Sequence, residues 1–475
     1  MSRFFFIGIG GIGMSALAEL LWAQGHVVAG SDVSLSDSVT HLRKKGIAVY
    51  LDHPLSDFLR FRSEMVVVNN AISPQNPLWL EAQKIGCKIL KRGELLAEFL
   101  NAKEGLAVSG SHGKTSTSSL LVYISRQLGK APSFAIGGRF SDTGENAHLG
   151  SSNQFIAEGD ESDASFLKLK PKVLGIVNID ADHMSTYQHS FELLLQHFAD
   201  WVLNLPVSGT AVLNSDDPGT LAMLEKVKKV QADFWKTRHL VFVGKVLPQA
   251  YESDSSNFIQ IRRIFPQESA IQVEFSSHDE SYHETFPLRG EFNVRNALMA
   301  GAMAAALGLK WAEILQVLKT YPGVRRRMQY WGTFQSAPVF EDYGHHPTEI
   351  VASVQALKLA YPQRRVIQVF QLHRYTRTRD LWEDFLHALS LSDYVLLFPI
   401  YSASEDPISG ISEVRFAEAL RQKRGASVQI VTSVDQALEI LEPLLKSSDL
   451  LLLQGAGDLP SLLREILIPR NVTMN

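Results

Sequence analysis

Residues 106–119 read LAVSGSHGKTSTSS, an apolar run followed by glycine, histidine, glycine, lysine and a string of hydroxyl side chains. A strand that turns through glycines into a helix points successive backbone N–H groups at a phosphate. The stretch departs from the consensus G-x-x-x-x-G-K-[ST], because Val108 stands where the first glycine would fall. The remaining G-x-x-G-K-T, from Gly110 to Thr115, still predicts a phosphate-binding loop.

Two side chains at the end of this loop suit phosphate chemistry. The Lys114 ammonium can offset phosphate charge, and the Thr115 hydroxyl can reach a magnesium ion. The alternative is a surface turn with a solvated lysine. The order of strand, loop and helix makes that alternative the weaker interpretation.

A second glycine loop lies near the N-terminus. Gly8-x-Gly10-x-x-Gly13 follows a predicted strand at residues 4–9 and opens a helix, and Asp32 ends the next predicted strand. This context is typical of a dinucleotide-binding fingerprint, in which glycines let the backbone approach a diphosphate. It indicates a nucleotide diphosphate more securely than a nicotinamide cofactor. Tight strand–helix packing without a ligand remains a third interpretation.

Composition narrows the class of protein. The 475 residues suggest about three domains, and 46 basic against 50 acidic residues offer no broad basic face for a nucleic acid. Cys87 is the only cysteine, which excludes a disulfide framework or a thiolate zinc site and favours a reducing compartment. The apolar segment 4–18 imitates a signal peptide, but four glycines interrupt it. We therefore expect a cytoplasmic protein with no membrane partner.

Strand-like runs alternate with helical periodicity along most of the chain, which predicts α/β architecture with parallel sheets covered on both faces. We predict three domains: a Rossmann-like N-terminal domain at 1–101, a central P-loop-type ATPase domain with a mostly parallel sheet at 102–322, and a C-terminal Rossmann-like domain at 323–475. The last boundary rests on Pro322–Gly323, the clearest break in composition.

Further motifs in the chain resemble those of a known family, the ATP-dependent Mur ligases that build the peptide of bacterial cell-wall precursors. Besides GSHGKT, the motifs are EGDESDASF (158–166), NIDADHMSTY (178–187), NSDDP (214–218), GEFNVRN (290–296), RRRM (325–328), EDYGHHPTE (341–349), HRYTRTRD (373–380) and QGAGD (454–458). Together they extend over nearly the entire chain. DYGHHPTE and HRYTRTRD are most similar to the alanine-adding branch of this family.

The resemblance implies an ATP- and Mg²⁺-dependent ligase that joins L-alanine to the carboxylate of UDP-N-acetylmuramic acid through an acyl phosphate. It also implies a ligand for each glycine loop, with the UDP-sugar on the first domain and ATP on the second. A recycling ligase that attaches a preformed tripeptide shares the same motifs. From other classes, a nicotinamide oxidoreductase or a P-loop regulatory ATPase would each explain only one of the two loops.

The resemblance assigns most of the ATP site. Lys114 would pair with the phosphates, Thr115 and Glu158 would hold one magnesium ion, and His183 would hold a second. Chemistry alone would make His183 a hydrogen-bonding residue or a base, since magnesium prefers oxygen ligands. The full predicted ATP set is Gly110, Ser111, His112, Gly113, Lys114, Thr115, Ser116, Asn293 and Asn296 at the adenine, Arg327 at the γ-phosphate and Asp342 at the ribose.

The resemblance also assigns the two substrates. The UDP-sugar would contact Gly10, Gly11, Ile12, Gly13 and Asp32, with residues 69–73 bordering the uridine, and the amino acid would lie among Tyr343, His345, Arg374 and Arg377. Because Arg327 and these last residues belong to the third domain, the site would be complete only after that domain closes. The acids Asp160, Glu161 and Asp163 are either metal-tuning groups or solvated loop charges.

The sequence departs from the family pattern at several positions. Phe292 replaces a usual histidine, which removes one polar contact and could substitute ring stacking, and Leu372 replaces a usual proline. Asn69 and Asn70 stand where serines are expected. Residues 190–205 contain no lysine, so the carbamylated lysine of other branches has no counterpart, as expected for the alanine-adding branch.

Overall fold

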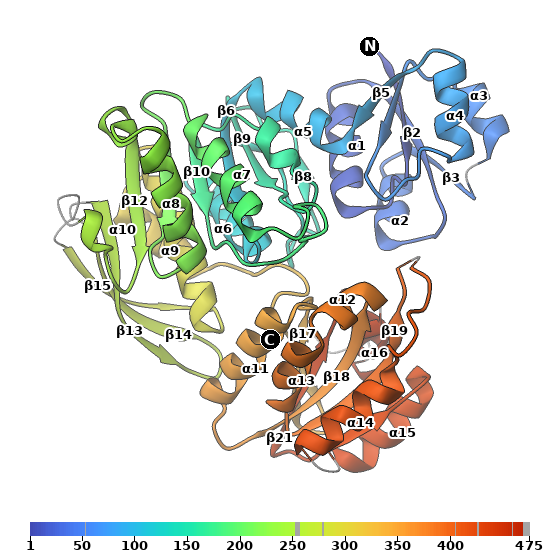
Figure 1. Cartoon of the computed structure of the whole chain (residues 1–475), viewed down its shortest axis with the longest axis vertical. Coiled ribbons are helices and arrows are strands. Elements are labelled where there is room, and N and C mark those ends of the chain that lie inside the picture. Colours follow the sequence, from blue (N-terminus) through green and yellow to red (C-terminus); the bar gives the residue numbers. More distant parts are fainter. Residues whose placement is uncertain are drawn as a thin grey trace. The chain divides into compact units, whose positions relative to one another are not determined.

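A computed structural model describes residues 1–52, 54–251, 257–277, 280–403, 405–424, 427–457 and 459–468. Asp458 of the QGAGD motif lies outside the described residues. The chain forms three β-sheets flanked by helices (Figure 1). It divides into two compact units, one comprising residues 1–263, 273–284 and 295–322 and the other 264–272, 285–294 and 323–475.

The first sheet is parallel, in the order β3-β2-β1-β4-β5. Its strands are β1 (Arg3–Ile7), β2 (Val27–Asp32), β3 (Ala48–Leu51), β4 (Met65–Val68) and β5 (Lys88–Lys91), and its helices are α1 (Ile12–Ala23), α2 (Asp37–Lys44), α3 (Leu55–Phe61), α4 (Pro77–Lys84) and α5 (Arg92–Asn101). The chain order reverses between β1 and β4, so ligands are expected beyond the carboxyl ends of these strands. The first glycine loop lies at that edge.

The second sheet has ten strands, in the order β15-β14-β13-β12-β11-β10-β6-β9-β7-β8. Its strands are β6 (Glu104–Ser109), β7 (Ser133–Ala135), β8 (Ala147–His148), β9 (Gln154–Gly159), β10 (Val173–Ile176), β11 (Thr210–Asn214), β12 (His239–Gly244), β13 (Phe258–Pro266), β14 (Ile271–Ser277) and β15 (Glu280–Phe286). The accompanying helices are α6 (Lys114–Gln127), η1 (Ser165–Lys168), α7 (Phe191–Leu203), α8 (Pro218–Val230), η2 (Phe234–Thr237), α9 (Glu291–Ala305) and α10 (Trp311–Leu318). The strands from β13 to β7 pair in parallel, whereas β7 and β8 are antiparallel.

The third sheet has the order β16-β17-β21-β18-β19-β20, with β16 as an antiparallel edge strand. Its strands are β16 (Gln329–Phe334), β17 (Ala337–Asp342), β18 (Arg365–His373), β19 (Tyr394–Tyr401), β20 (Val428–Ile430) and β21 (Asp449–Gln454), and its helices are α11 (Pro347–Ala360), α12 (Tyr375–Asp380), α13 (Trp382–Ser390), α14 (Glu413–Arg424), α15 (Val434–Leu444) and α16 (Leu459–Leu467). The predicted α/β class with three sheet-containing parts is confirmed. The exact domain boundaries remain a prediction.

Aromatic packing anchors the loops that follow the strands of the central sheet. The Phe166 ring lies 4.8 Å from that of Phe198 and meets Trp201 edge-on at 5.0 Å. All three side chains are buried, and burial of each contributes roughly 1.5–3 kcal/mol. Because Phe166 comes directly after the acidic segment 158–165, this packing fixes one end of that segment. None of the described helices is long and apolar enough to cross a membrane.

Candidate active site

The loop between β6 and α6 needs both of its glycines. Gly110 has φ 130° and Gly113 has φ 85°, values that side-chain-bearing residues rarely adopt. A Cβ at Gly110 would also lie 2.6 Å from the Asn178 carbonyl oxygen. The loop therefore turns tightly against the segment after β10, and Lys114 begins α6 as its first residue.

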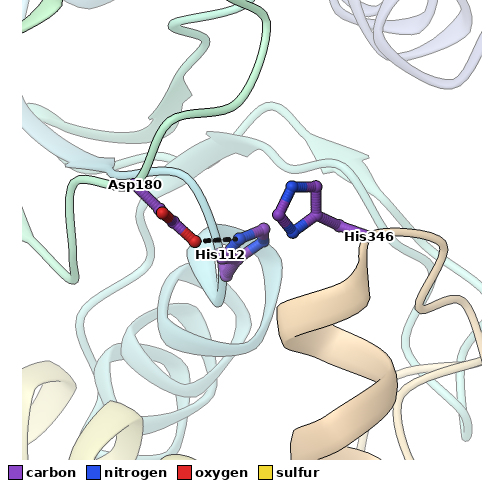
Figure 2. A group of neighbouring side chains, drawn as sticks. All are labelled: His112, Asp180 and His346. Carbon is purple, nitrogen blue, oxygen red and sulfur yellow. Dashed lines mark ion pairs between the residues drawn. The ribbon is translucent and has the colours of Figure 1, made fainter. Parts of the chain in front are cut away.

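Reciprocal hydrogen bonds hold this loop to residues 178–180. The Asn178 side chain accepts from the His112 N–H at 2.8 Å and donates to the His112 carbonyl at 2.9 Å. The Ser111 hydroxyl likewise bridges the backbone of Asp180. Figure 2 shows the His112 ring facing the Asp180 carboxylate, with 3.4 Å between Nε2 and Oδ2. These hydrogen bonds hold the phosphate loop in its turned conformation. Figure 2 also draws His346, which belongs to the other unit and caps the N-terminus of α11.

The Lys114 ammonium is paired with a buried carboxylate. It donates to Glu161 at 2.9 and 2.7 Å and to the Gly110 carbonyl at 2.6 Å. Burial lowers the pKa of Lys114, but the Glu161 and Asp160 carboxylates outweigh that effect and raise it above the ordinary value. Lys114 therefore stays cationic. Glu161 is 1% exposed, so the interpretation of this acid as a solvated loop charge is wrong.

Thr115 and Glu158 form the best-defined oxygen pair of the site. The Thr115 hydroxyl lies 3.2 Å from Glu158 Oε2, while Oε1 accepts from Ser118 at 2.8 Å and from the Gly137 N–H at 2.7 Å. A Cβ on Gly137 would lie 2.7 Å from Glu158 Oε2 and 3.0 Å from Thr115 Oγ1. A hydroxyl and a carboxylate oxygen side by side suit Mg²⁺, which prefers oxygen ligands. Glu158 lies within β9, not just past its end as the sequence suggested.

His183 lies on the turn after β10, in a left-handed conformation with φ 54°. Its backbone N–H donates to Asp182 Oδ1 at 2.7 Å, and its Nε2 lies 3.5 Å from Asp182 Oδ2.

The turn that carries His183 is held to the acidic segment. The Thr186 hydroxyl donates to the Ser162 carbonyl at 2.6 Å, and the Tyr187 hydroxyl donates to the Glu161 carbonyl. The loops carrying Glu158, Glu161 and His183 are therefore held to one another. The metal-binding role of His183 remains a prediction.

The predicted adenine residues both lie on α9 and are buried. Asn296 packs on the phosphate loop, since a Cβ on Gly113 would lie 2.9 Å from its side-chain oxygen. In the other unit, Asn293 donates to the Arg289 carbonyl at 2.9 Å. The Phe292 ring packs against the core of that same unit. Adenine contact by these residues stays a prediction.

The N-terminal glycine loop packs tightly against Asp32, and its contact with a sugar nucleotide remains a prediction. The Gly10 N–H donates to Asp32 Oδ2 at 2.8 Å, and a Cβ on Gly10 would come within 3.0 Å of Asp32, Val39 and Ser36. Gly8, with φ 76°, makes the turn out of β1. Asn146 donates to the Ile12 carbonyl at 3.0 Å and so connects this loop to the central sheet region.

A tyrosine and two arginines form a cluster in the second unit. The guanidinium groups of Arg326 and Arg327 both lie over the Tyr343 ring, at 4.9 and 5.0 Å from its centroid. Arg326 is anchored by the carbonyls of Gly455 and Gly457, both at 2.6 Å. Arg327 makes a longer ion pair, with 3.9 Å between its Nη1 and Glu349 Oε1. Its side chain is 26% exposed, against 21% for Arg326. The γ-phosphate role of Arg327 remains a prediction.

Asp342 is buried at the end of β17 and its carboxylate is fully engaged. Oδ1 accepts from Gly344, Ser353 and Gln454, and Oδ2 accepts from the Met328 N–H. Burial raises the pKa of Asp342, opposed by Arg327 and by these donors. In this conformation the carboxylate ties β17, β21 and α11 together, so binding the ATP ribose would require it to exchange partners.

The predicted amino-acid site is an aromatic cluster beside two arginines. The His345 ring lies 5.2 Å from Tyr343 and 5.8 Å from His373, and His373 stacks on Tyr401 at 5.3 Å.

The two arginines lie at the start of α12. Arg374 caps this helix with φ 71°, and Arg377 lies one turn further on. Burial, helped by Arg377 and Arg374, lowers the pKa of His373 to about 4. His373 is therefore neutral near pH 7.

Sequence reasoning missed several residues of these clusters. Ser118 and Gly137 hold Glu158, Asn178 holds the phosphate loop, and His373 with Tyr401 completes the aromatic group. His373, Ser118 and Asn178 lie in or beside the quoted motifs, so their position was a usable signal. Gly137 and Tyr401 lie outside the motifs, and their contacts with Glu158 and His373 are seen only in the folded chain.

Three family models match the chain: the Mur ligase catalytic domain at residues 3–116, the Mur ligase middle domain at 108–304 and the Mur ligase glutamate ligase domain at 326–457. Among solved structures, UDP-N-acetylmuramate–alanine ligase of Thermotoga maritima is similar with a TM-score of 0.81, 24% identity and 99% of each chain covered. A murein peptide ligase of Psychrobacter arcticus has a TM-score of 0.71 at 22% identity, covering 100% of both chains. A pseudomurein peptide ligase of Methanothermus fervidus has a TM-score of 0.60 at 18% identity, covering 98% of this chain and 99% of its own.

Two glycine loops on separate, largely parallel sheets, one of them with a lysine and an oxygen pair suited to magnesium, define a nucleotide-dependent α/β enzyme. The three consecutive family models identify it further. The chain belongs to the Mur ligase family of ATP-dependent amide ligases.

Proposed function

We propose that the protein joins L-alanine to UDP-N-acetylmuramic acid, using ATP and Mg²⁺. The observation that supports this most is the pair of separate glycine loops, one beside Asp32 and one carrying Lys114. The full-length similarity of fold to an alanine-adding enzyme, at 24% sequence identity, is consistent with this proposal.

In the proposed reaction, a carboxylate oxygen of the sugar nucleotide attacks the γ-phosphorus of ATP, and ADP leaves. The uncharged amine of alanine then attacks the acyl carbon, phosphate leaves and the amine proton is lost to solvent. Two anions must meet in the first step, so cationic groups have to reduce their repulsion. Lys114 and Arg327 would supply fixed positive charge, and Thr115 and Glu158 would hold the magnesium ion, which neutralises phosphate charge when bound.

The amino acid would bind in the second unit. Arg374 and Arg377 can hold a carboxylate through charge-assisted hydrogen bonds. The rings of Tyr343, His345 and His373 would border the side chain of the amino acid. Neutral His373 adds no positive charge there to repel the substrate amine.

The rival candidate is a recycling ligase that attaches a tripeptide, which the similarity to the murein peptide ligase supports. Phosphate release from ATP, measured with UDP-N-acetylmuramic acid plus either L-alanine or tripeptide, separates the two. We expect release with L-alanine. Turnover with tripeptide alone would establish the rival and reject alanine as the substrate.

A further inference from the structure

Arg92 packs against the first glycine loop and pairs with the acidic segment after β9. It belongs to none of the predicted substrate, ATP or metal sites. It is the first residue of α5 and directly follows β5, at the same sheet edge as the loop after β1. A Cβ on Gly13 would lie 3.3 Å from Arg92 Cδ and 3.4 Å from Arg92 Nη1. The guanidinium therefore lies against the first turn of α1, where a bound diphosphate is expected.

The far side of the guanidinium is held by the acidic segment of the central sheet. Arg92 Nη2 donates to Asp160 Oδ2 at 2.7 Å, with Asp163 Oδ2 at 3.4 Å. Asp160 is itself oriented by the Ser162 N–H, and Asp163 by the Ser165 N–H. An arginine has five donors in a rigid plane, and these contacts use only those of Nη2.

Close packing sets the position of the arginine. A Cβ on Gly93, the next residue, would lie 2.4 Å from Ser165 Cβ. Lys168 of η1 also pairs with Glu94 at 2.6 Å. The start of α5, and with it the backbone of Arg92, is thus fixed against η1.

We propose that Arg92 binds the diphosphate of the sugar nucleotide through Nη1 and Nε while Asp160 holds Nη2. Asp160 is then a positioning residue that acts through Arg92. The neighbouring Glu161 pairs with Lys114, so one short segment supports a cation at each nucleotide site. This inference rests on the proposed function and adds a binding residue to its first substrate.

The test is calorimetric titration of the full-length chain with UDP and, separately, with uridine, which lacks the diphosphate. Arg92→Gln should weaken UDP binding about 10- to 100-fold, the effect of one or two charge-assisted hydrogen bonds. Uridine binding should change less than about twofold, because the lost contact is to phosphate. Lys88→Gln, which removes an exposed cation from the adjoining β5 strand, is the matched control and should leave both affinities unchanged.

A double-mutant cycle tests the positioning role. Asp160→Asn should weaken UDP binding about 3- to 10-fold in the wild-type background and have no further effect in Arg92→Gln. An equal Asp160→Asn effect in both backgrounds would refute positioning through Arg92. If UDP binds wild type and Arg92→Gln equally well, the inference is wrong while the proposed function stands. If wild type binds no UDP, the proposed N-terminal substrate site is itself refuted.

Discussion

Lys114 has an anionic partner within the protein. Its ammonium donates to both oxygens of Glu161, a carboxylate almost without exposure. Since an unpaired buried charge is costly, this pairing keeps the lysine charged and oriented. Binding of ATP phosphates in the proposed site would replace Glu161 as the partner of the Lys114 ammonium.

Replacing Lys114 with alanine tests its phosphate role. We expect the turnover of phosphate release to fall about 10²- to 10³-fold, the usual effect of losing one preorganised group that stabilises transition-state charge. UDP affinity should stay within a factor of about two, because that ligand is assigned to the other loop. Lys172→Ala, an exposed lysine paired with Glu104, is the control. Retained turnover in Lys114→Ala would remove the lysine from the mechanism.

The lowered pKa of His373 predicts how stability depends on pH. Its pKa is about 4 in the folded chain against about 6.5 when unfolded, so the unfolded chain binds the extra proton as pH falls through this range. Stability contributed by neutral His373 is present above pH 6.5 and lost towards pH 4. When the pH is lowered from 6.5 to 4, the thermal unfolding midpoint of His373→Gln should therefore fall less than that of the wild-type protein. Identical slopes, with exposed His283→Gln as control, would contradict this.

At the scale of elements, short segments after strand ends carry the chemistry, and helices fix those segments. The segment after β9 supports both Lys114 and Arg92, while Phe166 is buried in the core just beyond it. The contact of α5 with η1 holds the first sheet's edge against this segment. The fit depends on Gly93, since any Cβ there meets Ser165.

Gly93→Ala should destabilise the protein by about 1–3 kcal/mol, because the new methyl group overfills the contact between α5 and η1. The thermal unfolding midpoint measures this. Ser165→Gly, which removes the opposing Cβ, should restore part of the loss when combined with Gly93→Ala. An unchanged midpoint in the single variant would show that the contact is looser than described.

Local patterns predicted the strands and loops well, but not the contacts made by distant segments. Gly10 with Asp32, and the glycines around Lys114, follow a spacing set by backbone geometry, so the sequence indicated them. Glu158 was placed past the end of β9 because a strand's last residues have no distinct local signal. The burial of Glu161 depends on a lysine 47 residues away, which no single-sequence pattern encodes.

At the scale of the whole molecule, the proposed reaction needs all three sheet-containing parts. The first would hold the sugar nucleotide, the second ATP, and the third Arg327 and the amino-acid site. The ribose-binding role of Asp342 would require its carboxylate to give up hydrogen bonds that it makes within its own unit. One core cluster runs from the first sheet into the second, a further cluster belongs to the first sheet alone, and two clusters pack on the third sheet.

Arg327→Ala tests the contribution of the third part. Turnover should fall about 10²- to 10³-fold through loss of charge stabilisation at the γ-phosphate, while UDP affinity stays unchanged. Arg379→Ala, an exposed arginine paired with Asp380, should have little effect. Phosphate-release kinetics of both variants provide the comparison, and equal turnover of Arg327→Ala and wild type would disprove the assignment.

The proposed reaction requires that both glycine loops bind their nucleotides at the same time. The direct measurement is calorimetric titration of UDP-N-acetylmuramic acid into the protein, first alone and then saturated with a non-hydrolysable ATP analogue and Mg²⁺. We predict one sugar nucleotide bound per chain in both cases. Loss of sugar-nucleotide binding in proportion to the analogue concentration would show that the two ligands compete for one site and that the proposed reaction is wrong.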